Sequence, residues 1–135
     1  MKVELRHKIS LASEPDAIGP ALDELESCLI EDGVSTEHVL EVRLLGEEAI
    51  TNVVKYAGAA SMALEVQVTR EEIVVVLRDN GKPFDPASTE SPDLEASLAD
   101  RPLGGLGIHL IQSLSDAVSY SREEDQNVLR LTKRR

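Results

Sequence analysis

Three polar side chains follow one another at four-residue steps near the middle of the chain: Glu48, Asn52 and Tyr56. On an α-helix, residues four apart lie on nearly the same face, so these three are predicted to form one polar row. A carboxylate, an amide and a phenol in such a row can hold a hydrated cation beside a reacting hydroxyl group. The alternative is a solvent-exposed helix edge, and this helix alone does not distinguish the two interpretations.

A second polar pattern comes directly after the most apolar run of the chain, Ile73–Leu77. Asp79, at the carboxyl end of this predicted strand, can accept a hydrogen bond from an exocyclic amine such as that of adenine. Gly81 has no Cβ, so the backbone there can approach a flat ring closely. The alternative is an ordinary Asp-Asn-Gly turn between two strands.

A glycine-rich segment supplies the third pattern. Such a loop at a helix N-terminus presents unpaired N–H groups and the positive end of the helix dipole, and both attract anions. A glycine hinge is the alternative, and neither the Walker A pattern nor the dinucleotide-binding glycine pattern is present. The residues are Gly104, Gly105, Leu106 and Gly107.

Hydrophobic periodicity predicts the elements that must position these residues. A 3.6-residue period predicts a helix from about residue 16 to Asp32-Gly33, a second from Ser35 or Thr36 to about Ala57, and a third from about residue 108. In the first of these, Pro20 is expected to be tolerated only within the first turn. Strands are predicted at 2–11, 62–69, 73–78, 117–122 and 128–132, with a turn through 123–127. Residues 81–103 contain one glycine and four prolines, which are too many for a long regular element: Gly81, Pro83, Pro86, Pro92 and Pro102.

Length and composition limit the possible functions. The 135 residues predict a single domain spanning 1–135, and a net charge of −11 argues against nucleic-acid binding and for protein partners or a cation-bridged ligand. No apolar run reaches the roughly 20 residues of a membrane span, and the charged opening does not fit a secretory signal. The lone Cys28 excludes an internal disulfide, so a cytoplasmic location is expected.

Taken together, the three patterns resemble the N box and the two glycine boxes of the GHKL ATP-binding superfamily, particularly its anti-sigma factor serine kinases of the RsbW and SpoIIAB type. The matching segments are Glu-x-x-x-Asn at 48–52, Asp-x-Gly-x-Pro-Phe-Asp-Pro at 79–86 and Arg-Pro-Leu-Gly-Gly-Leu-Gly-Ile at 101–108. The resemblance implies a Bergerat-type fold, an α/β (α+β) two-layer sandwich. Its sheet would be mixed and mainly antiparallel, with helices on one face.

The resemblance also implies roles in catalysis. Glu48 would be the general base toward an acceptor serine or threonine, and its four-residue step to Asn52 favours it over the neighbouring Glu47. Arg101 is a candidate for neutralising charge on the transferred phosphoryl group. A surface arginine that caps the loop is the alternative for Arg101.

The remaining implied roles concern ATP and Mg²⁺. Asn52 would bind Mg²⁺, Asp79 would hold the adenine amine, and Gly81 would admit the base. Tyr56 stands where many relatives carry His, so its part in nucleotide binding is open. A lid of residues 82–103 would cover the phosphates, which the backbone of the loop would hold at Gly104, Gly105, Leu106 and Gly107.

The implied activity is transfer of phosphate from ATP to a STAS-type anti-anti-sigma protein, with regulation of a sigma factor by exchange of partners. A homodimer is also implied. Three alternatives remain: a nucleotide-dependent binding module without transfer, an ATPase without an acceptor, and a scaffold.

Overall fold

The computed structural model describes residues 5–83 and 111–135. Two long helices and a π-helical turn follow the first strand, and two pairs of strands complete the described chain. Residues 111–114 are helical as well. The elements in order are β1 (Leu5–Ala12), α1 (Pro15–Glu31), α2 (Thr36–Asn52), η1 (Val53–Ala57), β2 (Ser61–Val68), β3 (Glu72–Asp79), β4 (Ala117–Glu123) and β5 (Gln126–Arg134).

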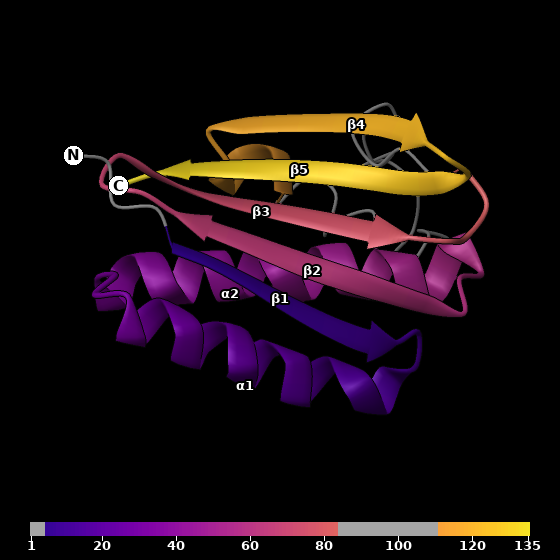
Figure 1. Cartoon of the computed structure of the whole chain (residues 1–135), viewed down its shortest axis with the longest axis horizontal. Coiled ribbons are helices and arrows are strands. Elements are labelled where there is room, and N and C mark those ends of the chain that lie inside the picture. The colour runs from indigo at the N-terminus through magenta and orange to yellow at the C-terminus, as the bar shows by residue number, and fades with distance from the viewer. Residues whose placement is uncertain (1–4, 84–110) are drawn as a thin grey trace, which may run out of the picture.

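The five strands form one sheet in the order β1-β2-β3-β5-β4, and each pair of neighbours is antiparallel. Figure 1 shows α1 and α2 lying side by side on one face of this sheet. The predicted two-layer sandwich with a mainly antiparallel sheet is therefore confirmed. No parallel pairing occurs among the strands that the structure describes.

The core lies between the helices and one face of the sheet. Because side chains alternate along a strand, β3 sends Ile73, Val75 and Leu77 toward the helices, and each is at most 2% exposed. The helices contribute stripes at 3.6-residue spacing, which include Leu25 of α1 and Leu45 of α2. Burial of these side chains is the main source of stability for the sandwich.

The first helix begins slightly earlier than the sequence predicts, at Pro15, so Pro20 lies beyond its first turn. Pro20 is exposed, so its ring disturbs no core contact. The buried stripe that includes Leu22 and Leu29 holds this helix to the sheet and offsets the missing backbone donor.

The second helix differs from the prediction at its C-terminal end. Ser35 caps its start, since the Ser35 hydroxyl accepts a hydrogen bond from the backbone N–H of His38 at 3.2 Å. The α-helix ends at Asn52 and continues as the π-helical turn η1, rather than running as α-helix to Ala57. Gly58 stops it as predicted, in the left-handed conformation with φ of 62°.

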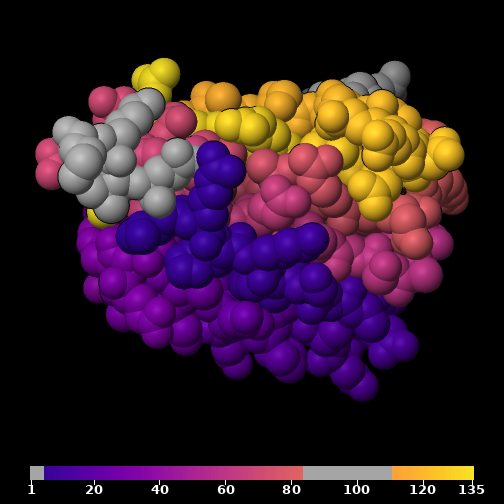
Figure 2. Space-filling model, in the orientation of Figure 1, coloured from indigo at the N-terminus to yellow at the C-terminus, as the bar shows by residue number. Residues whose placement is uncertain are grey.

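The N-terminal and C-terminal segments form opposite edges of the sheet. In Figure 2 the indigo atoms of β1 lie above the purple atoms of α1, and the orange and yellow atoms of β4 and β5 lie along the upper side of the molecule. In the part of the chain that the structure describes, no helix has both the length and the apolar character needed to cross a bilayer.

The β4–β5 connection is tighter than predicted. The strands extend to Glu123 and from Gln126, so only Glu124 and Asp125 remain in the turn, with φ of 49° and 64°. A two-residue hairpin with positive φ at both positions is the type I′ pattern, for which Asn-Gly is preferred. The acidic pair therefore holds a conformation that costs free energy.

We expect the double substitution Glu124→Asn, Asp125→Gly to raise the free energy of unfolding by about 1 kcal/mol, because it removes this backbone strain. Urea denaturation measures the change. Glu71→Gly, in the β2–β3 turn where φ is not positive, is the control and should not stabilise the protein. Equal stabilisation by both variants would contradict the explanation.

Candidate functional site

Two of the residues that the sequence singled out line one cavity at the end of the sheet. Asn52 comes from the end of α2 and Asp79 from the end of β3, and Tyr120 of β4 and Asn127 of β5 complete the polar lining. The enclosed space is about 10 Å³, which is close to the room that one water molecule needs. The described residues thus form a narrow polar recess rather than a complete ligand site.

Asp79 is only 4% exposed, and its carboxylate is held by specific hydrogen bonds. Its Oδ1 accepts from the backbone N–H of Gly81 at 2.9 Å and from Nδ2 of Asn127 at 3.0 Å. Its Oδ2 makes no hydrogen bond within the described part of the chain. One carboxylate oxygen is therefore fixed by the fold, and the other is left for a donor from outside.

Asn127 is a site residue that the sequence analysis did not single out. It is 3% exposed, and its Nδ2 also donates to the backbone carbonyl of Lys82 at 2.7 Å. Its Oδ1 accepts from the hydroxyl of Tyr120 and from Nη1 of Arg122, the latter at 3.2 Å. An Asn at the start of a strand gives no signal in sequence, because its partners lie on other strands.

Gly81 is required by close packing against the end of the long helix. A Cβ on Gly81 would lie 2.3 Å from the backbone oxygen of Ala57, which is too close for any side chain. The neighbouring N–H of Lys82 donates to that same oxygen at 2.8 Å. Oδ1 of Asn80 accepts from the N–H of Ala60 at 3.0 Å, so the loop is tied to the helix end on both sides. The sequence suggested glycine for admitting a base; the described contacts give a packing reason.

Asn52 is unusual because it is buried without hydrogen bonds. It is 2% exposed, and neither its amide oxygen nor its amide nitrogen has a partner among the described residues. Leaving buried polar atoms unpaired costs about 1–3 kcal/mol each, so such groups in native proteins usually have a functional explanation.

Glu48 lies one helical turn before Asn52 and is half-buried, whereas Glu47 is exposed. Burial raises the pKa of Glu48 above that of an ordinary carboxyl, the charge of Glu47 raises it further, and Lys55 lowers it. A carboxylate whose pKa is raised is a better proton acceptor than one in water, as a general base requires.

Tyr56 does not continue the predicted row in a regular way. It belongs to η1, where a π-helical turn takes more residues than an α-helical turn, so a four-residue step from Asn52 falls short of a full turn. The Tyr56 hydroxyl is buried, and burial raises its pKa. Within the described residues, Glu48 and Asn52 keep the α-helical spacing and Tyr56 does not.

Several predicted site residues lie outside the described residues. Of the predicted lid, only residues 82 and 83 are described. The arginine proposed to neutralise charge and the predicted phosphate loop also lie outside the described residues: Arg101, Gly104, Gly105, Leu106 and Gly107.

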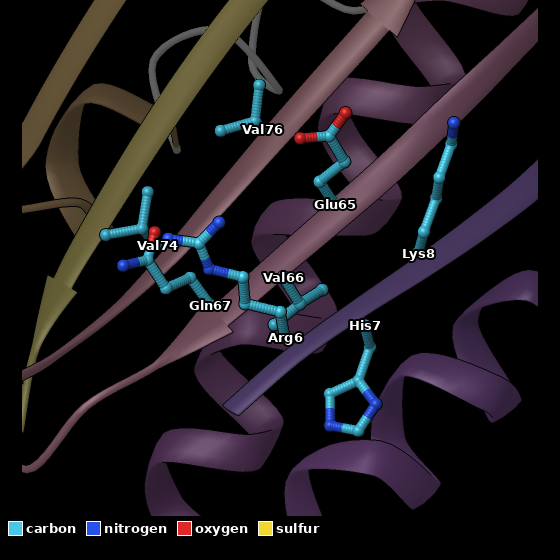
Figure 3. A pocket seen from close by; sticks show the side chains of 8 residues that line it. All are labelled: Arg6, His7, Lys8, Glu65, Val66, Gln67, Val74 and Val76. Carbon is cyan, nitrogen blue, oxygen red and sulfur yellow. The ribbon is translucent and has the colours of Figure 1, made fainter. Parts of the chain in front are cut away.

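A larger hollow of about 320 Å³ lies elsewhere, over β1, β2 and β3. Figure 3 shows the side chains around it, which include Arg6, Lys8, Glu65 and Val76. By strand alternation these project from the face opposite Asp79, so this hollow is separate from the recess. Within residues 5–83 and 111–135, no three His, Cys, Asp or Glu side chains gather as a metal site.

Comparison with known proteins identifies the family to which this chain belongs. Residues 11–133 match the model of the histidine kinase-like ATPase domain. The chain belongs to this family. Its members include the GHKL proteins that the sequence patterns resemble, so the predicted resemblance is confirmed.

Two curated relatives carry kinase names. The serine/threonine-protein kinase BtrW of Bordetella bronchiseptica is 34% identical over 116 residues, which make up 83% of this chain and 82% of that protein. The serine-protein kinase RsbW of Staphylococcus aureus is 28% identical over 100 residues, 67% of this chain and 63% of that protein. The match to RsbW thus spans a little under two thirds of its length.

The packing of Gly81 predicts a large effect of a very small substitution. We expect Gly81→Ala to lower the free energy of unfolding by about 2 kcal/mol or more, because the new methyl group meets a backbone oxygen that cannot rotate away. Gly19→Ala is the control, since apart from the neighbouring residues and the backbone of its own helix no atom lies within 4 Å of a Cβ there. The gain in helix propensity on replacing Gly is offset there by crowding of the new Cβ against the ring of Pro20, so the free energy of unfolding should change by less than about 1 kcal/mol. Urea denaturation of both variants checks the pair, and equal stabilities would contradict it.

The raised pKa of Glu48 predicts a pH-dependent effect of Glu48→Gln. A carboxyl whose pKa is raised by folding disfavours the folded state once it is ionised, so the substitution should stabilise the protein at neutral pH. As the pH falls through the raised pKa toward the ordinary carboxyl range, both states become protonated and the advantage should disappear. Urea denaturation across this range measures it, with the exposed Glu71→Gln as control. A stabilisation that does not change with pH would exclude ionisation as its cause.

Proposed function

We propose that this protein is an ATP-dependent serine/threonine protein kinase of the partner-switching type. The observation that carries the proposal is the recess between α2 and the sheet, in which a fixed Asp79 and an unpaired Asn52 face the same space. The kinase names of the two relatives support it. The motif spacing of the whole chain supports it as well.

Asp79 would recognise the adenine base. Its Oδ1 is saturated by Gly81 and Asn127, so only Oδ2 can accept a hydrogen bond from the exocyclic amine. A carboxylate selects a donor at that position and rejects the carbonyl of a guanine or hypoxanthine ring. This arrangement favours adenine nucleotides over guanine and hypoxanthine nucleotides.

Asn52 fits the role of a Mg²⁺ ligand. Its buried amide oxygen has no hydrogen-bond partner among the described residues, and amide oxygens are ligands that Mg²⁺ accepts. The cation would neutralise charge on the ATP phosphates as they react. Mg²⁺ commonly binds through few protein ligands together with substrate phosphates, which agrees with a single Asn here.

Glu48 would act as the general base. It takes the proton of the acceptor serine or threonine hydroxyl while that oxygen bonds to the γ-phosphorus of ATP and the bond to the β-phosphate oxygen breaks. The products are a phosphoserine or phosphothreonine and ADP. Arg101 and the backbone of Gly104, Gly105, Leu106 and Gly107 would bind the phosphates, beneath the lid of residues 82–103.

The acceptor would be a STAS-type anti-anti-sigma protein, and a sigma factor would be the alternative binding partner. This chain would bind each of them as a homodimer, in the cytoplasm. Most of the net charge lies in the helical layer, where residues 13–58 carry eleven acidic and two basic side chains. This surface repels nucleic acid and suits contact with a protein.

Incubation with γ-labelled ATP, Mg²⁺ and a STAS-domain protein tests the activity. We expect label on a serine or threonine of that protein with the wild-type chain, and none with Glu48→Gln, which should still bind ATP. Asp79→Asn should abolish ATP binding. If the new amide oxygen keeps the two hydrogen bonds that Oδ1 now accepts, the NH₂ group takes the place of Oδ2, and an NH₂ group cannot accept a hydrogen bond from the adenine amine. Mass spectrometry of the acceptor and calorimetry with ATP make the two measurements.

Other outcomes separate the alternatives. Tight ATP binding without label on any acceptor would favour a nucleotide-dependent binding module, and release of free phosphate by the chain alone would favour an ATPase. Normal transfer by Glu48→Gln would exclude Glu48 as the base. A wild-type chain that shows no thermal shift with Mg-ATP would favour a scaffold.

A further inference from the structure

Arg122 lies on the edge strand β4, outside each of the three sequence patterns, yet it contacts the loop that follows β3. Its Nη1 donates to the backbone carbonyl of Gly81 at 2.7 Å and to Oδ1 of Asn127 at 3.2 Å. Gly81 precedes it by 41 residues in the chain. One guanidinium thus joins the edge of the sheet to the loop that carries the recognition carboxylate.

The sheet register explains how this contact arises. Asp79 is paired with Asn127 across β3 and β5, and Asn127 is paired with Arg122 across β5 and β4. Directly paired residues point to the same face, so the three side chains form one row on the helix side of the sheet. Tyr120, two residues before Arg122 on the same strand, points to that face as well.

The hydrogen bonds in this row fix the orientation of the Asn127 amide. Tyr120 and Arg122 both donate to Oδ1, so the NH₂ group must face the opposite way, toward Asp79 and the Lys82 carbonyl. A flipped amide would place its oxygen against the Asp79 carboxylate, and this contact is repulsive. The two donors on β4 therefore determine that Asp79 receives a hydrogen bond.

We propose that Arg122, assisted by Tyr120, is a positioning residue that sets nucleotide selectivity by holding Asn127 and the Gly81 carbonyl in place. This inference rests on the proposed function. With Asn127 locked, Asp79 keeps Oδ1 occupied and presents only Oδ2 to the base. Without the lock, the carboxylate can rotate or accept water, and its preference for an amine over a carbonyl on the ring weakens.

A purely structural role predicts a different result. Arg122 is an exposed residue of an edge strand, and substitutions at such positions usually change stability by no more than about 0.5 kcal/mol. Selectivity between two bases that differ only along one ring edge, in the group on C6 and the proton on N1, reports on Asp79 and not on general folding. Adenosine diphosphate and inosine diphosphate are suitable probes, because the second has a carbonyl where the first has the amine.

The test is calorimetric titration of wild-type, Arg122→Met, Arg122→Lys and Tyr120→Phe chains with each diphosphate in the presence of Mg²⁺. We expect the wild type to prefer the adenine nucleotide, and Arg122→Met to lower that preference about tenfold, mainly through weaker adenosine diphosphate binding. Tyr120→Phe should act in the same direction, and Arg122→Lys should restore part of the preference. Arg130→Met, an exposed arginine of β5 on the opposite face, is the matched control and should bind like the wild type.

The outcomes distinguish this inference from the proposed function. A wild-type chain that binds neither nucleotide overturns both. A wild-type preference that Arg122→Met and Tyr120→Phe leave intact overturns the positioning role alone. Equal losses for both nucleotides also overturn it, because they indicate a general distortion of the site; urea denaturation of each variant identifies that case.

Discussion

A buried carboxylate is stable only when its oxygens are hydrogen-bonded, and the arrangement around Asp79 follows from this requirement. Asp79 is 4% exposed at the end of the most apolar strand. The N–H of Gly81 and the amide of Asn127 satisfy one oxygen, and the loop conformation and the start of β5 are thereby both tied to the carboxylate. The other oxygen has no hydrogen-bond partner among the described residues, and Asp79 lines the recess in which a ligand could supply one.

The end of the long helix is shaped by the same loop. The chain changes from α-helix to π-helix after Asn52 and stops at Gly58, and the oxygen of Ala57 accepts the N–H of Lys82. Gly81 packs against that residue with no space for a Cβ. π-Helical turns occur frequently at functional sites because they re-aim side chains within an otherwise regular helix. Here the turn brings the helix end against the loop and moves Tyr56 out of the row begun by Glu48 and Asn52.

Two features of α2 lower the stability of the protein and would not be expected in a helix that served only to form the fold. Asn52 is buried with its amide unpaired among the described residues, and Glu48 has a pKa raised by burial and by Glu47. A hydrophobic residue at position 52 would suit the core better, since Asn52 is 2% exposed. Native proteins keep such features mainly at sites that bind or react, and both lie on the helix face that the proposed kinase activity uses.

The sequence by itself determined where most helices and strands lie, because hydrophobic periodicity reports which face of each element is buried. The two-layer sandwich that these elements form was implied by the resemblance of the motifs to the GHKL superfamily. It also singled out Glu48, Asn52, Asp79 and Gly81 as candidate site residues, since four-residue spacing and a turn after an apolar strand are local features. The tertiary structure decided what sequence spacing cannot encode. The pairing of Asp79, Asn127 and Arg122 depends on the register of three strands, and the π-helical turn depends on the packing of the helix end against the loop. Local patterns fix what a residue can do, but only the folded chain brings partners from distant segments within hydrogen-bond distance.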